Sequence, residues 1–405
     1  MHSRLPSRTR SGRASTALLA LLLASGADSH ASGTRVGFKD AFATARGNAF
    51  VATADNPSAI YYNPAGITQL EGVQASANLY SVSLSSEYRG PGGTASLDED
   101  PVHVPSLYLT FKPDDSAWAF GFGAYVPFGL ETEWPVGSPL GTLALRNEQK
   151  YQTLDFTAAW QAAPALSLAA SLTYNQASVD LRRSLGVFGP GDLFRFEGDG
   201  DAFGAKLGLL WRPSERHSFG VSYTHFTRVE IEGRSQTLPL ISSEPAAATF
   251  EFPEVLIVGW SYRPTPAWNI EVNLDWTNWD RFDTVRIDKP SGATTLPFHW
   301  ESGLFYELGV TRYFGDFNVS AGYCFTENST PDATYTPAVP DSNRGFYSLG
   351  AGYRGTRYTV DLAWQYADGG SREVSGSPAS LVGASADGTY ENSVQALSLS
   401  VGLKF

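Results

Sequence analysis

The feature that most limits the fold of this chain is a two-residue alternation of apolar and polar side chains. Between Trp268 and Thr277 every second residue is large and apolar, and the residues between them are polar. The ranges 118–129, 358–366 and 397–405 repeat the design, with small residues on the second face of 118–129. Side chains of a β-strand point alternately to opposite faces, so this pattern predicts strands with one apolar face. The fold class expected is all-β.

The connections between these strands alternate between short and long, and about fourteen strands can be counted. The short connections lie at 112–115, 162–164, 212–215, 263–266, 314–316 and 354–356. The long ones lie at 85–101, 131–150, 183–200, 233–249, 278–300, 326–344 and 367–391. In outer-membrane β-barrels the short turns and both termini face the periplasm, whereas the long loops face outward. A soluble sandwich also shows two-residue alternation, but aromatic residues near the strand ends favour a transmembrane antiparallel β-barrel.

The start of the chain predicts export from the cytoplasm. Several arginines precede an apolar run from Ala17 to Ala24, and small residues follow up to Ala31, as in a cleavable secretory signal. Cleavage leaves Ser32 or Asp28 as the first mature residue, and we favour Ser32. No later apolar run approaches the roughly 18 residues of a membrane-spanning helix. The formal net charge of -12 argues against a nucleic-acid partner.

We therefore divide the chain into a signal peptide (1–31), an N-terminal hatch (32–72) and a transmembrane β-barrel (73–405). The hatch range shows neither a helical nor a strand period, yet it contains several aromatic residues. The lumen of a fourteen-stranded barrel is too wide for side chains alone to fill, so we expect this segment to plug it. The alternative is a flexible periplasmic tail, which would usually contain fewer aromatics.

The same segment carries a family resemblance. The run TADNP at 53–57 is followed by AIYY at 59–62 and then by Asn63, Pro64, Ala65 and Gly66. This order resembles the N-terminal hatch of the FadL family of outer-membrane transporters for long-chain fatty acids and other hydrophobic compounds. Further segments at 125–130, 252–254, 276–280 and 339–344 also look like family segments and follow in the same order. The resemblance covers about 37–405, nearly the whole mature chain.

The resemblance implies a fourteen-stranded barrel with a hatch, and transport of a fatty acid or an aromatic hydrocarbon by binding in the lumen. The matched motifs do not separate these two ligands, and we favour long-chain fatty acids. The alternatives are a general diffusion porin and a surface adhesin that transports nothing. We expect no enzyme, no catalytic residue, no metal and no cofactor.

Alternation along the strands assigns charged residues to the lumen. The acids expected to point inward are Asp155, Glu271, Asp275, Glu307 and Asp361. Lys206 and Arg228 share the inward phase, while the side of Arg182 is ambiguous. A fatty acid carboxylate in an apolar cavity needs a cation, because an unpaired buried charge is costly. Lys206, Arg228 and Arg182 are thus the predicted ligand-binding residues, although ion pairing with the hatch would explain inward charges equally well.

One strand carries an unusual proline. Pro127 lies on the inward phase of the strand at 118–129 and has no N–H to donate. It therefore interrupts the hydrogen-bond ladder to one neighbouring strand. With Gly121, Gly123 and Gly129 nearby, it is the predicted lateral gate, and the FadL family similarly uses a kinked third strand as a lateral exit. The alternative is that Pro127 merely ends the strand at the outer rim.

The last residue, Phe405, is predicted to be an assembly signal. Leu403 and Phe405 share the outward phase of the final strand. A terminal aromatic resembles the signal that the outer-membrane insertion machinery reads. The expected partners are therefore a hydrophobic ligand, outer-membrane lipid and that machinery.

Overall fold

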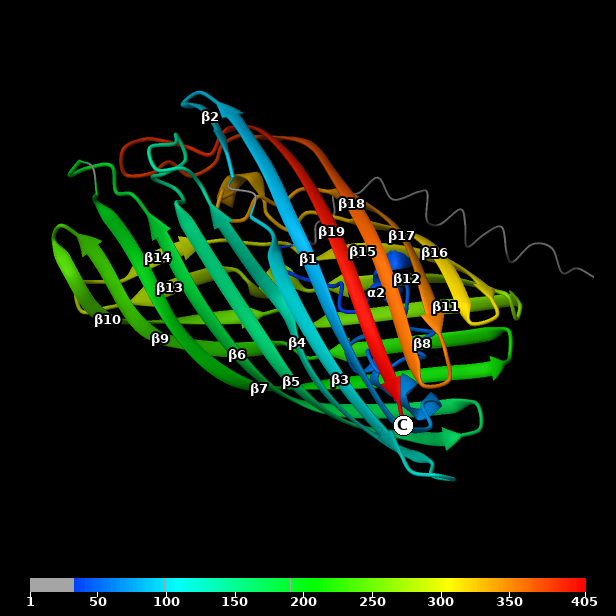
Figure 1. Cartoon of the computed structure of the whole chain (residues 1–405). Coiled ribbons are helices and arrows are strands. Elements are labelled where there is room, and N and C mark those ends of the chain that lie inside the picture. Colours follow the sequence, from blue (N-terminus) through cyan, green and yellow to red (C-terminus); the bar gives the residue numbers. More distant parts are fainter. Residues whose placement is uncertain (1–32, 98–99, 190) are drawn as a thin grey trace, which may run out of the picture.

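The wall of the molecule is a closed antiparallel barrel of fourteen strands (Figure 1). The computed structural model describes residues 33–97, 100–189 and 191–405, so the predicted signal peptide 1–31 lies outside the described residues. The ring closes because the last strand, β19 (Gly388–Lys404), pairs with the first, β1 (Gly72–Gly90). Within the described part of the chain, no helix is both long and apolar enough to span a membrane.

Twelve further wall strands lie between β1 and β19, and two of them are interrupted. In chain order they are β3 (Val102–Lys112), β4 (Trp118–Glu133), β5 (Arg146–Ala163), β6 (Leu166–Arg183), β7 (Leu193–Ser214), β8 (His217–Thr224) continued by β9 (Thr227–Leu238), β10 (Ile241–Phe252) continued by β11 (Val255–Thr265), β12 (Trp268–Thr277), β15 (Gly303–Phe314), β16 (Phe317–Thr326), β17 (Arg344–Arg354) and β18 (Tyr358–Val374). Outside the wall, β2 (Gly93–Ser96) pairs with β1, and the hairpin of β13 (Thr284–Asp288) and β14 (Thr294–Pro297) pairs with β10.

The predicted connections are mostly confirmed. All six short turns join neighbouring wall strands, at the end of the barrel where Phe405 lies. The long loop predicted at 233–249 is wrong, because β9 and β10 run through it and only Pro239 and Leu240 separate them. These strand ends rise beyond the apolar band, so their outer face carries Glu230, Glu232 and Arg234 and lacks the apolar half of the pattern.

The outer surface of the wall is apolar around the ring. Large apolar side chains that are at least 36% exposed include Leu79, Leu107, Leu154, Leu172, Leu308, Leu362 and Leu399. Near the short turns the outer surface carries aromatic rings, among them Trp118 stacked on Trp160 and Trp211 stacked on Phe219. An apolar belt bordered by aromatics is what a barrel needs to sit in a lipid bilayer.

The N-terminal segment, Gly33 to Leu70, lies inside the ring of strands (Figure 1). It contains two short helices, α2 (Ala41–Ala45) and α3 (Ala59–Tyr62), and the 3₁₀-helix η1 (Pro64–Gln69). Inward-facing glycines of the wall make room for its backbone. A Cβ at any of these positions would come within 3 Å of the segment: Gly121, Gly208, Gly220, Gly259, Gly309 and Gly322. The wall and the segment are therefore fitted to each other.

The motif Asn63 to Gly66 has a local structural reason. The Asn63 side chain caps η1 by accepting from the Ala65 N–H at 3.2 Å, and Pro64 takes the first helical position, where no N–H is needed. Asn63 also donates to the Leu209 carbonyl of the wall at 2.9 Å. A Cβ on Gly66 would overlap Ala54. This motif fastens the segment to β7.

The C-terminal residue gives a first prediction. Phe405 is 80% exposed, and its N–H donates to the Val73 carbonyl at 2.9 Å. Little packing depends on its ring, so an assembly defect after its removal would reflect recognition. We expect deletion of Phe405 to lower the amount of heat-modifiable barrel in membranes several-fold, and Phe405→Tyr to retain it. Normal folded levels without Phe405 would contradict the role in assembly.

Candidate functional site

The wall opens between β3 and β4. Their ladder covers only Leu107 to Phe111 on β3 and Phe120 to Ala124 on β4, although β3 begins at Val102 and β4 continues to Glu133. On their other sides both strands stay paired, β3 with β1 and β4 with β5. The two strands therefore separate toward the loop end, and we call this place the wall gap.

A β-bulge in β4 bends this strand at the wall gap. Tyr125 pairs with Thr153 and Phe128 with Tyr151, so two residues of β4, Val126 and Pro127, stand opposite one residue of β5. One extra residue moves all later side chains to the other face. Tyr125 and Phe128 are accordingly both buried. Pro127 thus lies in a bulge, and the alternative that it ends the strand is wrong.

Beyond the bulge, β4 pairs with the N-terminal segment. Arg35 forms an antiparallel bridge with Phe128. The Val36 N–H donates to the Pro127 carbonyl at 2.9 Å, and the Gly129 N–H donates to the Thr34 carbonyl at 2.9 Å. Opposed residues of such a pair normally exchange two hydrogen bonds, so the N–H that Pro127 lacks belongs opposite the Val36 carbonyl. Residues 34–36 therefore cover the wall gap from inside, held by an incomplete ladder.

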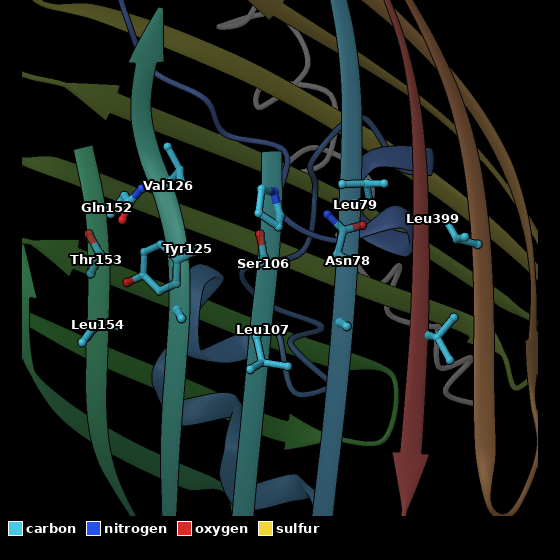
Figure 2. Close-up of a pocket in the computed structure, with 14 residues that line it drawn as sticks. Asn78, Leu79, Ser106, Leu107, Tyr125, Val126, Gln152, Thr153, Leu154 and Leu399 are labelled. Atoms are coloured by element: carbon cyan, nitrogen blue, oxygen red, sulfur yellow. The ribbon is translucent and has the colours of Figure 1, made fainter. Parts of the chain in front are cut away.

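Two cavities meet at the wall gap. The luminal cavity, about 310 Å³, is lined inside the barrel by apolar side chains such as Val36, Phe38 and Tyr80. The exterior groove, about 600 Å³, runs down the membrane-facing side past Leu79, Leu107, Leu154 and Leu399 (Figure 2). Three residues line both: Pro105, Val126 and Gln152.

The segment 34–36, which covers the wall gap, carries one cation, Arg35. It donates to both carboxylate oxygens of Asp275 at 2.6 Å and lies over the Phe305 ring at 4.9 Å. Burial opposes its charge, but the ion pair with Asp275 outweighs burial and raises the pKa of Arg35. Next to it, burial and the Arg35 charge lower the pKa of Lys39 well below its usual value. The charge of Arg35 is therefore stabilised by Asp275, a partner that Lys39 lacks.

The three predicted ligand-binding cations do not all lie in the lumen. Lys206 does face the lumen, where its ammonium donates to the Ile60 and Tyr61 carbonyls at 2.8 and 2.7 Å. Arg228 does not, because the break between β8 and β9 shifts the alternation by one residue and leaves its side chain 68% exposed outside. Arg182 is also on the outer phase of β6 and pairs with Asp180. The inward assignment of Arg228 was wrong.

The three predicted gate glycines lie in two different places. Gly121 and Gly123 lie in the paired part of the β3–β4 ladder, opposite Thr110 and Tyr108. A Cβ on Gly121 would come within 2.8 Å of Ile60, so this residue makes room for α3 and does not belong to the wall gap. Gly129, in contrast, lines the luminal cavity. Of the four predicted gate residues, Pro127 and Gly129 therefore lie beyond the paired part of the β3–β4 ladder, whereas Gly121 and Gly123 lie within it.

The predicted inward acids are all buried, and most bind the N-terminal segment. Besides the pair of Arg35 with Asp275, Glu271 pairs with Arg46 at 3.2 Å, and Glu307 accepts from Asn48 at 2.8 Å. Asp155 accepts from Tyr125 on β4 at 2.8 Å. Asp361 is 5% exposed. Removing one partner of a buried ion pair typically costs about 3–5 kcal/mol, so these contacts hold the segment firmly.

Sequence reasoning missed two residues of this site. Pro105 lies in the unpaired part of β3 and lines both cavities, so each strand that borders the wall gap carries a proline, which has no N–H. A proline inside the alternating run 102–112 was a usable signal. Arg35 gave no such signal, because it lies in a segment without periodicity, and only the folded chain brings it to Asp275.

Comparison with known proteins agrees with this architecture. Residues 28–405 match the sequence profile of a family described as "Outer membrane protein transport protein (OMPP1/FadL/TodX)". Outer membrane protein P1 of Haemophilus influenzae is 21% identical, over 78% of this chain and 82% of its own. A Neisseria meningitidis serogroup B protein, named as an outer membrane protein, is 24% identical over 88% of this chain and 90% of its own.

Solved structures show the same fold. A Pseudomonas aeruginosa FadL homologue superposes with a TM-score of 0.83 at 19% identity, covering 92% of this chain and all of the other. The toluene transporter TodX of P. putida gives a TM-score of 0.72 at 18% identity, covering 93% of this chain and 99% of the other. Since the family profile spans the whole described barrel, this chain belongs to the OMPP1/FadL/TodX family of outer-membrane transport proteins.

Proposed function

We propose that this outer-membrane protein takes up long-chain fatty acids and releases them sideways through the wall gap into the membrane. The observation that carries the lateral route is the meeting of the luminal cavity and the exterior groove at Pro105, Val126 and Gln152. An apolar molecule that leaves there need not cross water. Keeping apolar surface in water costs ~25 cal/mol per Å², so a direct passage from lumen to lipid saves most of that cost.

The way in which the N-terminal segment is held also supports the lateral route. In this proposal the segment is a hatch that stays in the lumen during transport. Wall glycines such as Gly208 and Gly322 fit its backbone closely, and Glu271 and Asp275 hold Arg46 and Arg35. Moving the whole segment would break several buried ion pairs at once. Withdrawing residues 34–36 from β4 breaks the backbone hydrogen bonds at Pro127 and Gly129 and the bond of Gln149 to Thr34. Of the buried ion pairs it breaks one, Arg35 with Asp275, and leaves Arg46 with Glu271 intact. The lateral opening is therefore the less costly one.

The lining of the luminal cavity supports a fatty acid as the transported substrate. Its volume lies at the lower end of the roughly 300–1,000 Å³ usual for small-molecule sites. Apolar residues form most of its wall, and three cations border it together with three carboxylates, Asp100, Glu131 and Glu148. The cations are Arg35, Lys150 and Arg344, and a ligand carboxylate there competes with their partners Asp275, Glu148 and Asp341. A carboxylate in an apolar cavity needs a cation as its partner, whereas an aromatic hydrocarbon needs none. A general porin would need an open lumen, and the N-terminal segment lies inside this one.

A competitive uptake assay tests this substrate class. In a strain lacking the protein, we expect re-expression to restore uptake of labelled oleate, with little competition from excess toluene. Toluene uptake should be unchanged by re-expression. If toluene uptake depends on the protein and oleate uptake does not, the substrate is an aromatic hydrocarbon, although the lateral route would still stand. If neither depends on it, the transport proposal fails.

A further inference from the structure

A second polar cavity lies at the opposite end of the barrel from the loops. It has a volume of about 470 Å³ and is bordered by the short turn between β7 and β8 and by the end of β11. Its floor is the N-terminal segment, through Ala52, Thr53, Asp55 and Gln69. Because short turns face the periplasm, we call this cavity the periplasmic recess. It is separate from the luminal cavity, with which it shares no lining residue.

The recess gathers positive charge in a protein that is acidic as a whole. Three arginines line it, Arg212, Arg216 and Arg263, against two carboxylates, Asp55 and Glu215. The net charge of the whole chain is -12. A local excess of guanidinium groups against this background indicates a place built for negative charge.

Most of the hydrogen-bonding capacity of these arginines is unused. Arg212 donates to the neutral side-chain amide of Gln69 at 2.9 Å. Arg263 contacts Asp55 at 3.3 Å, but Asp55 is shared with Arg354 on β17, also at 3.3 Å. Arg216 has no side-chain hydrogen bond or ion pair among the described residues. Since each guanidinium carries five N–H donors, most donors of these three lining residues have no protein partner among the described residues.

The backbone holds the two turns together. The Arg263 N–H donates to the Arg216 carbonyl at 2.8 Å, so these residues stay side by side. The Ser218 hydroxyl donates to the Ala52 carbonyl at 2.6 Å and fixes the floor against β8. Planar guanidinium groups bind carboxylate and phosphate oxygens in pairs. The backbone and the floor of the recess are therefore held in place, while the exposed side chains of Arg212 and Arg216 can turn toward a bound oxyanion.

We propose that the periplasmic recess binds the carboxylate or phosphate group of a small anion from the periplasm through Arg212, Arg216 and Arg263. The bound group competes with Asp55 for Arg263. The site therefore lies directly on the hatch segment, on the side away from the wall gap. This assignment does not depend on which molecule the luminal cavity carries.

Binding titrations on the full mature protein in a non-ionic detergent test the site. The probes are pyrophosphate and citrate, at low ionic strength because salt screens exposed charges. The variant Arg212→Gln with Arg216→Gln should weaken binding of the better probe at least about tenfold. The control, Arg234→Gln with Arg286→Gln, removes two exposed charges at the loop end and should change binding less than about twofold. Folding of each variant is checked by heat modifiability.

For a third variant we expect the affinity for the anion to rise instead of fall. Asp55→Asn frees Arg263 from its internal carboxylate, so binding should tighten several-fold. A preference for pyrophosphate would identify the group as a phosphate, and a preference for citrate would identify it as a carboxylate. The proposal is overturned if neither anion binds, if the control weakens binding as much as the recess variant, or if Asp55→Asn also weakens it.

Discussion

Deleting residues 32–71 is expected to turn a nearly silent protein into a steady ion conductor, with single-channel conductance in planar bilayers rising by about tenfold or more. The wall strands pair around the whole ring without this segment, so the barrel should still fold. What remains inside is a wide lumen whose inward glycines have lost their partners. Water and ions then fill it.

The charge left behind gives this experiment a second readout. The deletion removes Arg35 and Arg46, whereas their partners Asp275 and Glu271 stay on the wall. The open lumen should therefore pass cations in preference to anions. Heat modifiability confirms that the barrel has folded. Conductance at the original level in folded protein would mean that the segment does not close the lumen, and anion selectivity would contradict the assigned lumen charges.

Replacing Pro127 with valine is expected to reduce oleate uptake per folded barrel about fivefold while leaving thermal stability unchanged or slightly higher. The new N–H comes to lie opposite the Val36 carbonyl and completes the ladder between β4 and residues 34–36. One such hydrogen bond contributes about 1 kcal/mol, which favours the closed arrangement by about fivefold. Covering the wall gap more tightly should slow release.

The matched control for this change is Pro245→Val. Pro245 lies in β10, opposite Arg234 and away from the wall gap, and the same substitution there should leave uptake unchanged. If Pro127 has only a packing role, stability falls and uptake falls in proportion to the folded protein. Specific uptake at the wild-type level in Pro127→Val would contradict lateral release at this residue.

The alternation of side chains predicted much of the fold without knowledge of the tertiary structure. It identified the all-β class, the strand count and the six short turns at one end of the barrel. The two-residue period is a local property of each strand, and it is clear wherever one face of the strand contacts lipid. Where lipid ends, the pattern ends too, and β9 and β10 were mistaken for a loop. Inward acids such as Glu271 and Asp275 were also placed correctly, since unbroken strands keep their phase.

The site depended on irregularities that a local pattern does not fix. The bulge at Val126 and Pro127 and the break before Thr227 each shift the phase of their strand by one residue. The break is the reason why Arg228 lies on the outer surface and not in the lumen. Pro127 marked the right strand, but the partner of that strand beyond the bulge lies about ninety residues earlier, at Arg35. The sequence by itself determined a barrel with one weak strand. Only the tertiary structure decided where the wall opens and what covers it, because contacts between distant segments set both.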